Sequence, residues 1–337
     1  MIGFFSVTRQ DGAARCGEMA TAHGTIATPA FMPVATQGTV KAVAHEELEA
    51  LGFGLLIMNA YHLAVRPGIE AIRRAGGLHR FTAWRGAIAT DSGGFQIMSL
   101  AHLRTVTDAG VVFRAPLDGG RHEFTPESVV AMQETYGSDI AMVLDECPSH
   151  PCSAEAAEGA VARTSLWARR SVAARREGIG ALFGIVQGGT DPALRRRSAE
   201  EIGALGFDGF ALGGLSVGED KDAMAETVAL SAPLLPRDRP RYLMGVGEPG
   251  DVVAAIGEGI ALFDCVFPPR GARNGRALTK RGRVVIRNAE AAGQDGPVDE
   301  GCACPACTRY GRAYLRHLIH AGEITGMRLL TLHNLSY

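Results

Sequence analysis

The stretch "DIAMVLDEC", residues 139–147, says most about the fold. It is a nearly continuous apolar string rather than an alternation of apolar and polar residues. Strands of a parallel sheet that is covered on both faces have this pattern. The stretch therefore predicts a buried parallel strand that ends near Asp145.

Similar short apolar runs recur along the chain, and helical stretches lie between most of them. Residues 125–137 begin with Thr125 as a helix cap, and residues 153–176 are alanine-rich and amphipathic. Repeated alternation of strand and helix predicts a (β/α)8 TIM barrel, with residues 1–337 forming one domain. The other runs are "PAFMPVAT" (29–36), "GLLIMN" (54–59), "GAIATDSG" (86–93), "LFGIVQGG" (182–189), "GFALGGL" (209–215), "RYLMGVG" (241–247) and "ALFDCVF" (261–267).

Two segments, residues 101–124 and 270–307, fall outside this alternation. Both contain strand-like stretches, "VVFRAPL" and "RVVIRN", beside glycine-rich turns. We expect them to be inserted β segments. The second leads into a C-terminal subdomain of about residues 270–337.

Composition narrows the class of protein. Hydrophobic residues make up 46% and charged residues 21% of the 337 residues, which is typical of a globular protein. The chain has no apolar run of membrane-spanning length, and its first residues lack the features of a signal peptide. We therefore expect a cytoplasmic protein with no membrane partner.

A cysteine cluster near the end predicts a metal site. Cys302, Cys304 and Cys307 lie within six positions, and His333 follows. These four side chains supply the tetrahedral Cys3His set that structural zinc sites use. A closed set of four ligands leaves no open position, so we expect one structural Zn²⁺ per chain. Incidental thiols are the alternative.

The formal net charge of −2 hides a basic stretch at residues 270–287 that contains no acidic residue. Charge runs of this kind are usually solvated faces, but they also bind phosphate backbones. The stretch therefore favours an RNA or DNA partner. Its cations are Arg270, Arg273, Arg276, Lys280, Arg281, Arg283 and Arg287.

Polar residues and glycines stand at the ends of the predicted strands. In a (β/α)8 barrel the carboxyl ends of the strands form the face that carries the active site. Taken one at a time, such residues are as often turns or helix caps. Together they predict a site: Asn59, Asp91, Asp145, Gln187, Gly213, Gly214, Gly245 and Asp264.

Eight motifs follow one another along the chain: "NAYHLAVRPG", "TDSGGFQIMSL", "GSDIAMVLDECP", "FGIVQGG", "LGGLSVGE", "YLMGVG", "FDCVFPPRGARNG" and the C-x-C-x2-C-x25-H spacing. In their order and spacing, the sequence resembles the bacterial tRNA-guanine transglycosylases from about Phe5 to its last residue. The resemblance implies exchange of guanine at the wobble position (position 34) of tRNA, in a U-G-U anticodon core, for preQ1 in queuosine biosynthesis.

The resemblance implies that Asp264 is the nucleophile, which attacks ribose C1′ and forms a covalent intermediate. It implies that Asp91 is the general acid/base. Chemistry at an anomeric carbon with paired carboxylates is consistent with these roles. The resemblance also implies base-binding roles for Ser92, Phe95, Asp145, Gln187, Gly214, Leu215 and Met244. We add Asn59 to this set because it stands at the end of a predicted strand.

The family match also assigns RNA contacts and an assembly. Arg270 and Arg273 match positions that hold the uridines beside the exchanged base, although Pro269 departs from the common family pattern. Val217 at the site matches enzymes that use preQ1 rather than queuine. A homodimer is implied by an aromatic cluster of Trp84, Tyr310, Tyr314 and His317, whose last three members we expect on one helix.

Two other functions remain as alternatives. A barrel hydrolase acting on carbohydrate also uses two carboxylates, but it leaves the cysteine spacing and the basic stretch unexplained. A non-catalytic partner subunit keeps the barrel and loses catalytic carboxylates, whereas Asp91, Asp145 and Asp264 are all present. A guanine-exchange assay separates the three.

Overall fold

The computed structural model describes residues 4–95, 104–114, 119–176 and 178–337. The chain forms two compact units. The barrel unit comprises Met1–Met32, Thr36–Gly38 and Gly54–Asp264. The C-terminal unit comprises Pro33–Ala35, Thr39–Phe53 and Cys265–Tyr337.

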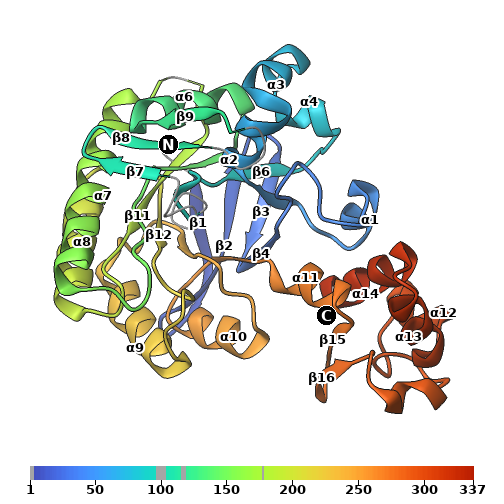
Figure 1. The fold of residues 1–337 in the computed structure, drawn as a ribbon. Helices are drawn as coiled ribbons and strands as arrows, with labels where there is room; N and C mark the ends of the chain where they lie inside the picture. Colours follow the sequence, from blue (N-terminus) through green and yellow to red (C-terminus); the bar gives the residue numbers. More distant parts are fainter. Residues whose placement is uncertain (1–3, 96–103, 115–118, 177) are drawn as a thin grey trace. The chain divides into compact units, whose positions relative to one another are not determined.

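An eight-stranded sheet forms the centre of the barrel unit (Figure 1). The order is β4-β14-β13-β12-β11-β10-β6-β5, and the ladders from β5 through β14 are parallel. All eight predicted strands are confirmed, which establishes the (β/α)8 TIM barrel. The strands are β4 (Ala30–Pro33), β5 (Leu55–Met58), β6 (Ala87–Thr90), β10 (Ile140–Met142), β11 (Ala181–Val186), β12 (Gly209–Leu212), β13 (Arg241–Leu243) and β14 (Leu262–Cys265).

Most of these strands are buried along their whole length, as their apolar sequences predict. Helices lie outside the sheet and cover it (Figure 1). Side chains of Thr125, Ser153, Asp191 and Asp220 cap four of the helices by accepting backbone N–H hydrogen bonds. The helices are α2 (Ala60–Leu63), the π-helix η1 (Ala64–Gly68), α3 (Ile69–Ala75), α4 (Leu78–Thr82), α6 (Pro126–Tyr136), α7 (Ala154–Ala174), α8 (Pro192–Gly203), α9 (Lys221–Ser231), the 3-10 helix η3 (Ala232–Leu234) and α10 (Pro249–Gly257).

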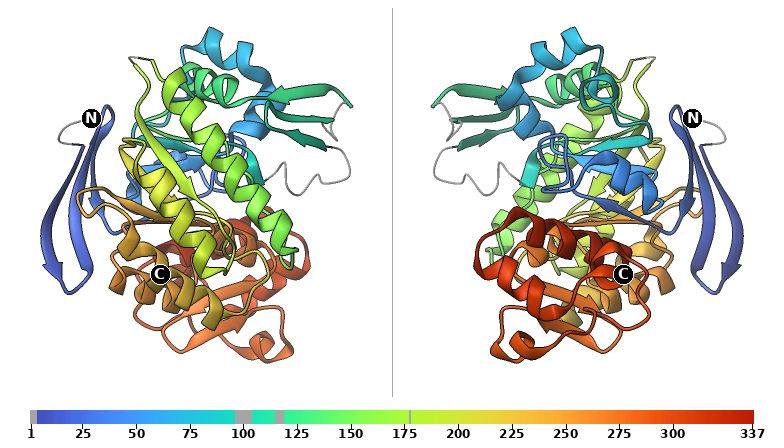
Figure 2. Two further views of the ribbon diagram at one scale, coloured as in Figure 1. Left: turned by 90° about the vertical axis from the view of Figure 1, so that its left-hand side faces the viewer. Right: turned by 90° about the vertical axis from the view of Figure 1, so that its right-hand side faces the viewer.

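Two antiparallel sheets accompany the barrel, on different sides of it (Figure 2). The sheet of β7 (Arg104–Thr107), β8 (Gly110–Arg114) and β9 (Arg121–Phe124) is the insert predicted after the third barrel strand. Residues 101–103 and 115–118 of that insert lie outside the described part. The other sheet was not predicted from the sequence; its strands are β1 (Phe5–Asp11), β2 (Ala14–Thr21) and β3 (Gly24–Thr28).

The C-terminal unit has its own apolar core, which includes Ile286, Leu315 and Leu330. The predicted second insert forms the hairpin β15–β16. Its elements are α1 (His45–Ala50), α11 (Phe267–Arg273), β15 (Arg276–Thr279), β16 (Gly282–Val285), the 3-10 helix η4 (Ala289–Gly293), α12 (Pro305–Arg309), α13 (Arg312–His320) and α14 (Ile324–Ser336).

The expected helical stripe of aromatic residues is only partly correct. Tyr314 and His317 lie on α13, but Tyr310 precedes that helix in extended conformation at the end of α12. The three rings still form one stacked row, with centroid separations of 5.5 Å and 6.5 Å. Trp84 is buried in the barrel unit, where its Nε1 donates a hydrogen bond to the Ala87 carbonyl.

No helix in the described ranges combines the length and the apolar character needed to cross a membrane.

Candidate active site and metal centre

Asp91 follows β6 directly, at the carboxyl end of the barrel. Its Oδ1 accepts hydrogen bonds from the backbone N–H of Ala60 (2.9 Å) and Gly93 (3.2 Å), and its Oδ2 accepts one from Asn59 Nδ2 (2.6 Å). Burial raises the pKa of Asp91 to about 7; the negative charges of Asp264 and Asp145 add to the rise, and the two backbone donors oppose it. A carboxyl group with this pKa can give and take a proton near neutral pH.

Asp264 lies on β14, the last barrel strand. Its Oδ1 accepts hydrogen bonds from the Tyr242 hydroxyl (2.6 Å) and the Gly245 N–H (2.7 Å). Burial raises the pKa of Asp264, whereas the Gly245 and Tyr242 hydrogen bonds oppose that rise. Both donors contact the same oxygen, so Oδ2 is the oxygen left for chemistry among the described contacts.

Asp145 follows β10 and is buried at the same end of the barrel. Its Oδ2 accepts a hydrogen bond from Gln187 Nε2 (2.7 Å), and its Oδ1 accepts one from the Ser92 hydroxyl (3.1 Å). Burial raises the pKa of Asp145 to about 6, and the Gln187 and Ser92 hydrogen bonds oppose the rise. A Cβ at Gly94 would lie 2.4 Å from Asp145 Oδ1, so only glycine allows this approach.

Gln187 and the loop after β12 face one another. Gln187 Oε1 is buried and has no hydrogen-bond partner among the described residues, so it is an acceptor available to a ligand. A Cβ at Gly214 would lie 2.3 Å from that oxygen, and the φ of Gly214 is +67°. Gly214 therefore has to be glycine for both space and backbone conformation. Its N–H interacts with the buried thiol of Cys147.

The remaining predicted base-binding residues differ in exposure. Phe95 is 54% exposed, Met244 is half-buried and Leu215 is buried. Asn59 has both ends of its amide engaged, because Oδ1 also accepts the His62 N–H (2.9 Å) while it caps α2. Asn59 therefore helps to hold Asp91 in place, and its second Nδ2 hydrogen has no hydrogen-bond partner among the described residues.

Glu219 closes the same loop. Its carboxylate accepts hydrogen bonds from the backbone N–H groups of Ser216 and, at 3.0 Å, Val217. A charged group that binds two loop amides fixes the conformation of the loop that carries Leu215.

Two residues of the site were missed from the sequence. The Tyr242 hydroxyl donates a hydrogen bond to Asp264. The sequence feature that could have identified Tyr242 is a tyrosine within a fully buried strand, because a buried hydroxyl requires a hydrogen-bond partner. Arg195 is fully buried, and its guanidinium donates to the carbonyls that follow β11 and β12, those of Val186 (3.1 Å), Gly189 (2.6 Å) and Gly213 (2.8 Å). The sequence feature that could have identified Arg195 is its spacing from Ser198, Ala199 and Ile202, which places all four residues on one face of α8.

The predicted metal ligands come together in the C-terminal unit. His333 Nδ1 lies 3.7, 3.5 and 3.3 Å from the sulfurs of Cys302, Cys304 and Cys307, and all four donor atoms lie within 4.8 Å of one another. His333 Nε2 lies 2.7 Å from the Leu278 carbonyl, which leaves the Nδ1 lone pair free to face the sulfurs. Three sulfurs and one imidazole nitrogen fit a closed structural metal site.

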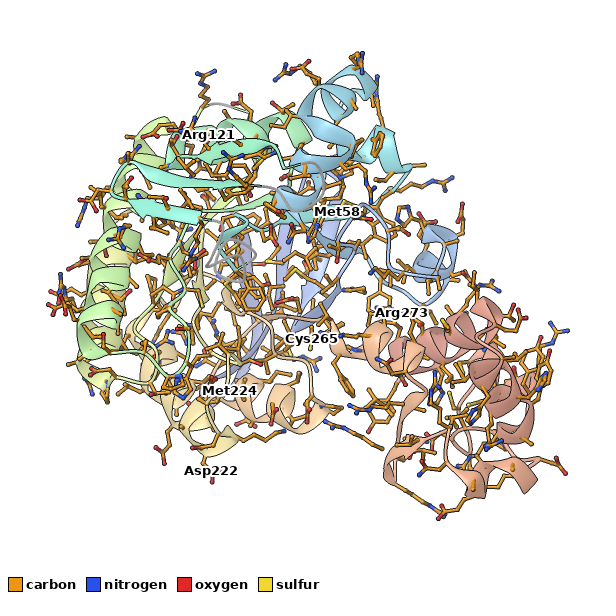
Figure 3. All side chains as sticks on the ribbon, viewed as in Figure 1. Met58, Arg121, Asp222, Met224, Cys265 and Arg273 are labelled. Atoms are coloured by element: carbon orange, nitrogen blue, oxygen red, sulfur yellow. The ribbon has the colours of Figure 1, made fainter. Side chains whose placement is uncertain are left out.

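Arg270 and Arg273 belong to α11 of the C-terminal unit. Arg270 is exposed, and Arg273 is half-buried with its guanidinium donating to the Pro269 carbonyl (2.9 Å). Figure 3 shows Arg273 on this helix. The other cations of residues 270–287 follow along β15–β16 and beyond, and all of them are exposed.

Comparison with known proteins agrees with this geometry. The family model described as queuine tRNA-ribosyltransferase matches residues 10–337. The chain belongs to the queuine tRNA-ribosyltransferase family. It is 52% identical over 336 residues to a queuine tRNA-ribosyltransferase of Desulforudis audaxviator, covering 99% of this chain and 90% of the relative.

Two further members of the queuine tRNA-ribosyltransferase family are equally similar. The protein of Pelotomaculum thermopropionicum is 53% identical over 335 residues, covering 99% of this chain and 90% of the relative. The protein of Thermus thermophilus is 51% identical over 333 residues, covering 99% of this chain and 86% of the relative. The family assignment makes this chain a glycosyltransferase of tRNA processing.

Proposed function

We propose that this enzyme exchanges guanine at the wobble position of tRNA, in a U-G-U anticodon core, for preQ1. The observation that carries the proposal is a pair of carboxylates with different environments on the catalytic face of one barrel. Asp264 is held by two donors on one oxygen, and Asp91 has a pKa of about 7. Two such groups divide nucleophilic and proton-transfer work between them.

In the first half-reaction, Oδ2 of ionised Asp264 attacks ribose C1′ while the bond from C1′ to guanine N9 breaks. An ester between the ribose and Asp264 results. The Tyr242 hydroxyl and the Gly245 N–H keep the attacking carboxylate ionised and orient it. Because both donors bind Oδ1, they leave the Oδ2 lone pairs to the substrate.

Asp91 donates a proton in the first half-reaction and accepts one in the second. In its protonated form it gives the proton to the departing guanine and is left as a carboxylate. The carboxylate then takes the N9 proton of the incoming preQ1, whose nitrogen attacks C1′ and releases Asp264. A pKa of about 7 serves both directions, because neither transfer is strongly uphill near neutral pH.

Base recognition is proposed for the buried polar groups between β6 and β12. The Asp145 carboxylate accepts from the amidine N–H donors of guanine or preQ1, with Ser92 beside it. The Gln187 side-chain NH2 group, one hydrogen of which is donated to Asp145, and the backbone at Gly214 and Leu215 contact the carbonyl side of the base. Phe95 and Met244 pack against its two faces.

The preference for preQ1 over queuine is proposed from the loop after β12. Val217 is branched and fills space that the larger queuine substituent needs. Glu219, at present bonded to the Ser216 and Val217 amides, offers a carboxylate to the ammonium group of preQ1. Competition of the two bases for the same tRNA tests this: equal or better use of queuine defeats it, and Val217→Gly should move preference towards queuine.

The C-terminal unit supplies RNA contacts and a structural metal. We propose that Arg270 and Arg273 hold the uridines beside the flipped-out guanine and that the exposed cations along β15–β16 contact phosphates. We propose zinc as the ion held by Cys302, Cys304, Cys307 and His333, since tetrahedral sulfur and imidazole donors favour it.

A homodimer through the aromatic row of Tyr310, Tyr314 and His317 is proposed for the assembly, since Tyr314 is 47% exposed. Trp84 adds little to such a contact, because it is 2% exposed within the barrel unit. A monomeric mass by light scattering at micromolar concentration would count against the dimer.

The decisive experiment is incorporation of labelled guanine into unmodified tRNA, together with trapping of a covalent RNA adduct on a denaturing gel. Exchange and an adduct are expected with tRNA that carries the U-G-U core and are not expected when the central guanosine is replaced by adenosine. Carbohydrate hydrolysis without exchange, or neither activity, would refute the proposal.

A further inference from the structure

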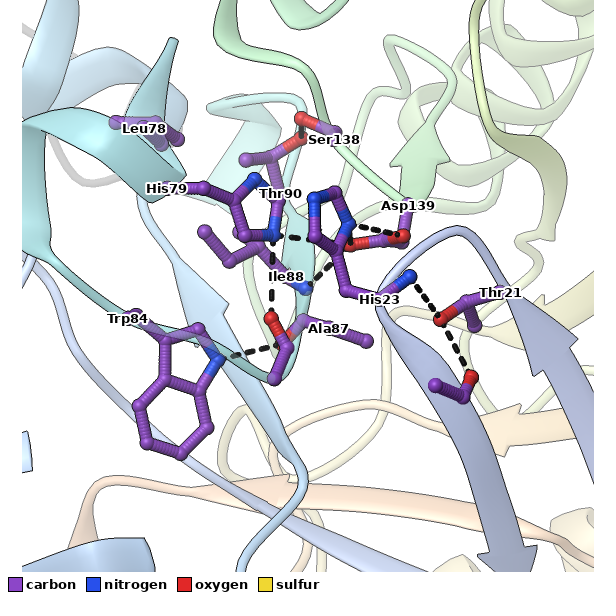
Figure 4. Close-up of polar contacts among 12 residues, drawn as sticks. Thr21, His23, Leu78, His79, Trp84, Ala87, Ile88, Thr90, Ser138 and Asp139 are labelled. Carbon is purple, nitrogen blue, oxygen red and sulfur yellow. Dashed lines mark hydrogen bonds and ion pairs between the residues drawn. The ribbon is translucent and has the colours of Figure 1, made fainter. Parts of the chain in front are cut away.

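A second group of side chains that could hold a metal ion consists of His23, His79 and Asp139 (Figure 4). His23 is on the turn between β2 and β3, His79 is on α4, and Asp139 directly precedes β10. Asp139 therefore stands at the amino end of the strand whose carboxyl end leads to Asp145. The cluster is not part of the active site.

The donor atoms of the three residues converge. His23 Nδ1 lies 2.9 and 3.0 Å from the two carboxylate oxygens of Asp139, and His79 Nε2 lies 3.2 Å from Oδ2. These separations are those of hydrogen bonds. Ligands that share one ion at bond lengths of about 2.1 Å lie roughly 3.0–3.5 Å from one another, so a small outward movement of the imidazole nitrogens brings the same donors to the spacing of a common coordination sphere. The Gly86 carbonyl, 3.1 Å from the same His79 nitrogen, adds an oxygen donor.

The carboxylate is held ready for a ligand. Its side chain is 1% exposed, and the Ile88 N–H donates to Oδ2 at 2.9 Å, which fixes its orientation from within the barrel. The outer side is accessible, because the His23 side chain is 35% exposed and the His79 side chain is 14% exposed. An ion therefore has an entry path from solvent.

The two imidazole rings are stacked, with centroids 3.5 Å apart and planes 13° apart. The lone pair of an imidazole nitrogen lies in the plane of its ring, so two parallel rings do not aim at one ion. One ring has to turn about its side-chain bonds. That ring is His23, which is on an exposed turn, whereas His79 also contacts the Gly86 carbonyl within the structure.

We propose that His23, His79 and Asp139 form a second metal site, which takes a divalent first-row transition ion such as zinc. Two imidazole nitrogens and a carboxylate are donors that such ions prefer over calcium or magnesium. The ion joins the β2–β3 turn to α4 and to the start of β10. Its role is to clamp the antiparallel β1–β3 sheet to the base of the barrel, separately from the base-exchange reaction.

The test is the zinc content of tag-free enzyme, measured by mass spectrometry of the metal after equilibrium dialysis against micromolar Zn²⁺. Two ions per chain are expected in the unmodified enzyme: one in the Cys3His site and one here. His23→Ala and His79→Ala should each contain one ion. The control His122→Ala, which removes a histidine of the β7–β9 sheet, should keep two.

A single ion in the unmodified enzyme, or two ions in both cluster variants, would overturn the proposal. In the first case the trio is only a hydrogen-bonded link between histidines and a carboxylate. Hydrogen exchange gives an independent readout: added Zn²⁺ should slow exchange in residues 14–28 of the unmodified enzyme and not in His23→Ala. Exchange that is unchanged by zinc in the unmodified enzyme would also count against the site.

Discussion

Replacement of Tyr242 by phenylalanine tests how Asp264, the proposed nucleophile, is kept ionised. The change removes the hydroxyl that donates to Asp264 Oδ1 at 2.6 Å and leaves the Gly245 N–H at 2.7 Å in place. This hydrogen bond opposes the burial that raises the pKa of Asp264. Without it the pKa of Asp264 rises further, so a larger fraction of the carboxyl is protonated at a given acidic pH.

The size of the effect follows from the hydrogen bond. Bonds to charged groups contribute about 1.5–3 kcal/mol, which corresponds to a rate change of about 10- to 160-fold where ionised Asp264 is scarce. The defect should shrink as pH rises, because the carboxylate becomes ionised again. The acidic limb of the pH profile therefore moves to higher pH in Tyr242→Phe.

The assay is single-turnover formation of the covalent RNA adduct between about pH 5 and 8. Tyr136→Phe is the matched control: it removes a buried hydroxyl whose partner is the Ala60 carbonyl at 3.4 Å rather than a carboxylate. That variant should leave the acidic limb where it is. A Tyr242→Phe defect of the same size at every pH would refute the reasoning, because it would indicate lost packing instead of lost ionisation.

Four other changes have defined outcomes. Asp264→Asn should abolish the RNA adduct on a denaturing gel, since an amide is no nucleophile; an undiminished adduct would contradict its role. Because Asp91 has to be protonated to release guanine and its pKa is about 7, adduct formation should fall roughly tenfold per pH unit well above 7, and Asp91→Asn should slow exchange about 100-fold or more and remove this limb. Cys304→Ala should lower the metal content by one ion per chain and destabilise the C-terminal unit, so unchanged metal content would disprove the ligand set. Arg195→Met removes the donor of the Gly189 and Gly213 carbonyls, whereas the Val186 carbonyl keeps the Gly213 N–H, and it should lower the free energy of unfolding by about 2 kcal/mol or more, measured by denaturant titration, with weaker guanine binding; an unaffected KM for guanine would count against its positioning role.

The barrel could be predicted from the sequence because its strands are buried on both faces. A strand of this kind, such as β11 with six consecutive buried residues, has an apolar run that stands out from the surrounding helices. The sheet β1–β3 was missed for the opposite reason. β1 is almost entirely exposed, so its sequence has neither an apolar run nor a clean alternation.

Position along a strand predicts which polar side chains lie near one another at the carboxyl end of the barrel. Asp91, Asp145 and Gln187 each follow a barrel strand, and the barrel brings such positions together. Arg195 was missed because arginine is rarely buried, and the face of α8 on which its spacing places it consists mostly of small residues. The link between His23 and Asp139 joins residues 116 positions apart and follows no local pattern, so only the folded chain shows it.

The arrangement of the C-terminal unit has a consequence for synthesis on the ribosome. Helix α1 belongs to this unit and is joined to α14 by the Glu47–Arg328 ion pair, whose partners are 281 positions apart. At a translation rate of roughly 5–20 residues per second, Arg328 is synthesised about 15–55 seconds after Glu47, so the ion pair cannot form before then.

A shorter delay applies to α11, the helix that carries Arg270 and Arg273, because Asn334 follows Pro268 by 66 positions. Asn334 donates hydrogen bonds to the Pro268 and Arg276 carbonyls and accepts one from the Leu278 N–H. The neighbouring residue is the metal ligand His333. The helix that carries Arg270 therefore reaches its final support only after the chain has been translated through Asn334. A nascent enzyme that has completed its barrel strands still lacks the finished helix for which RNA contacts are proposed.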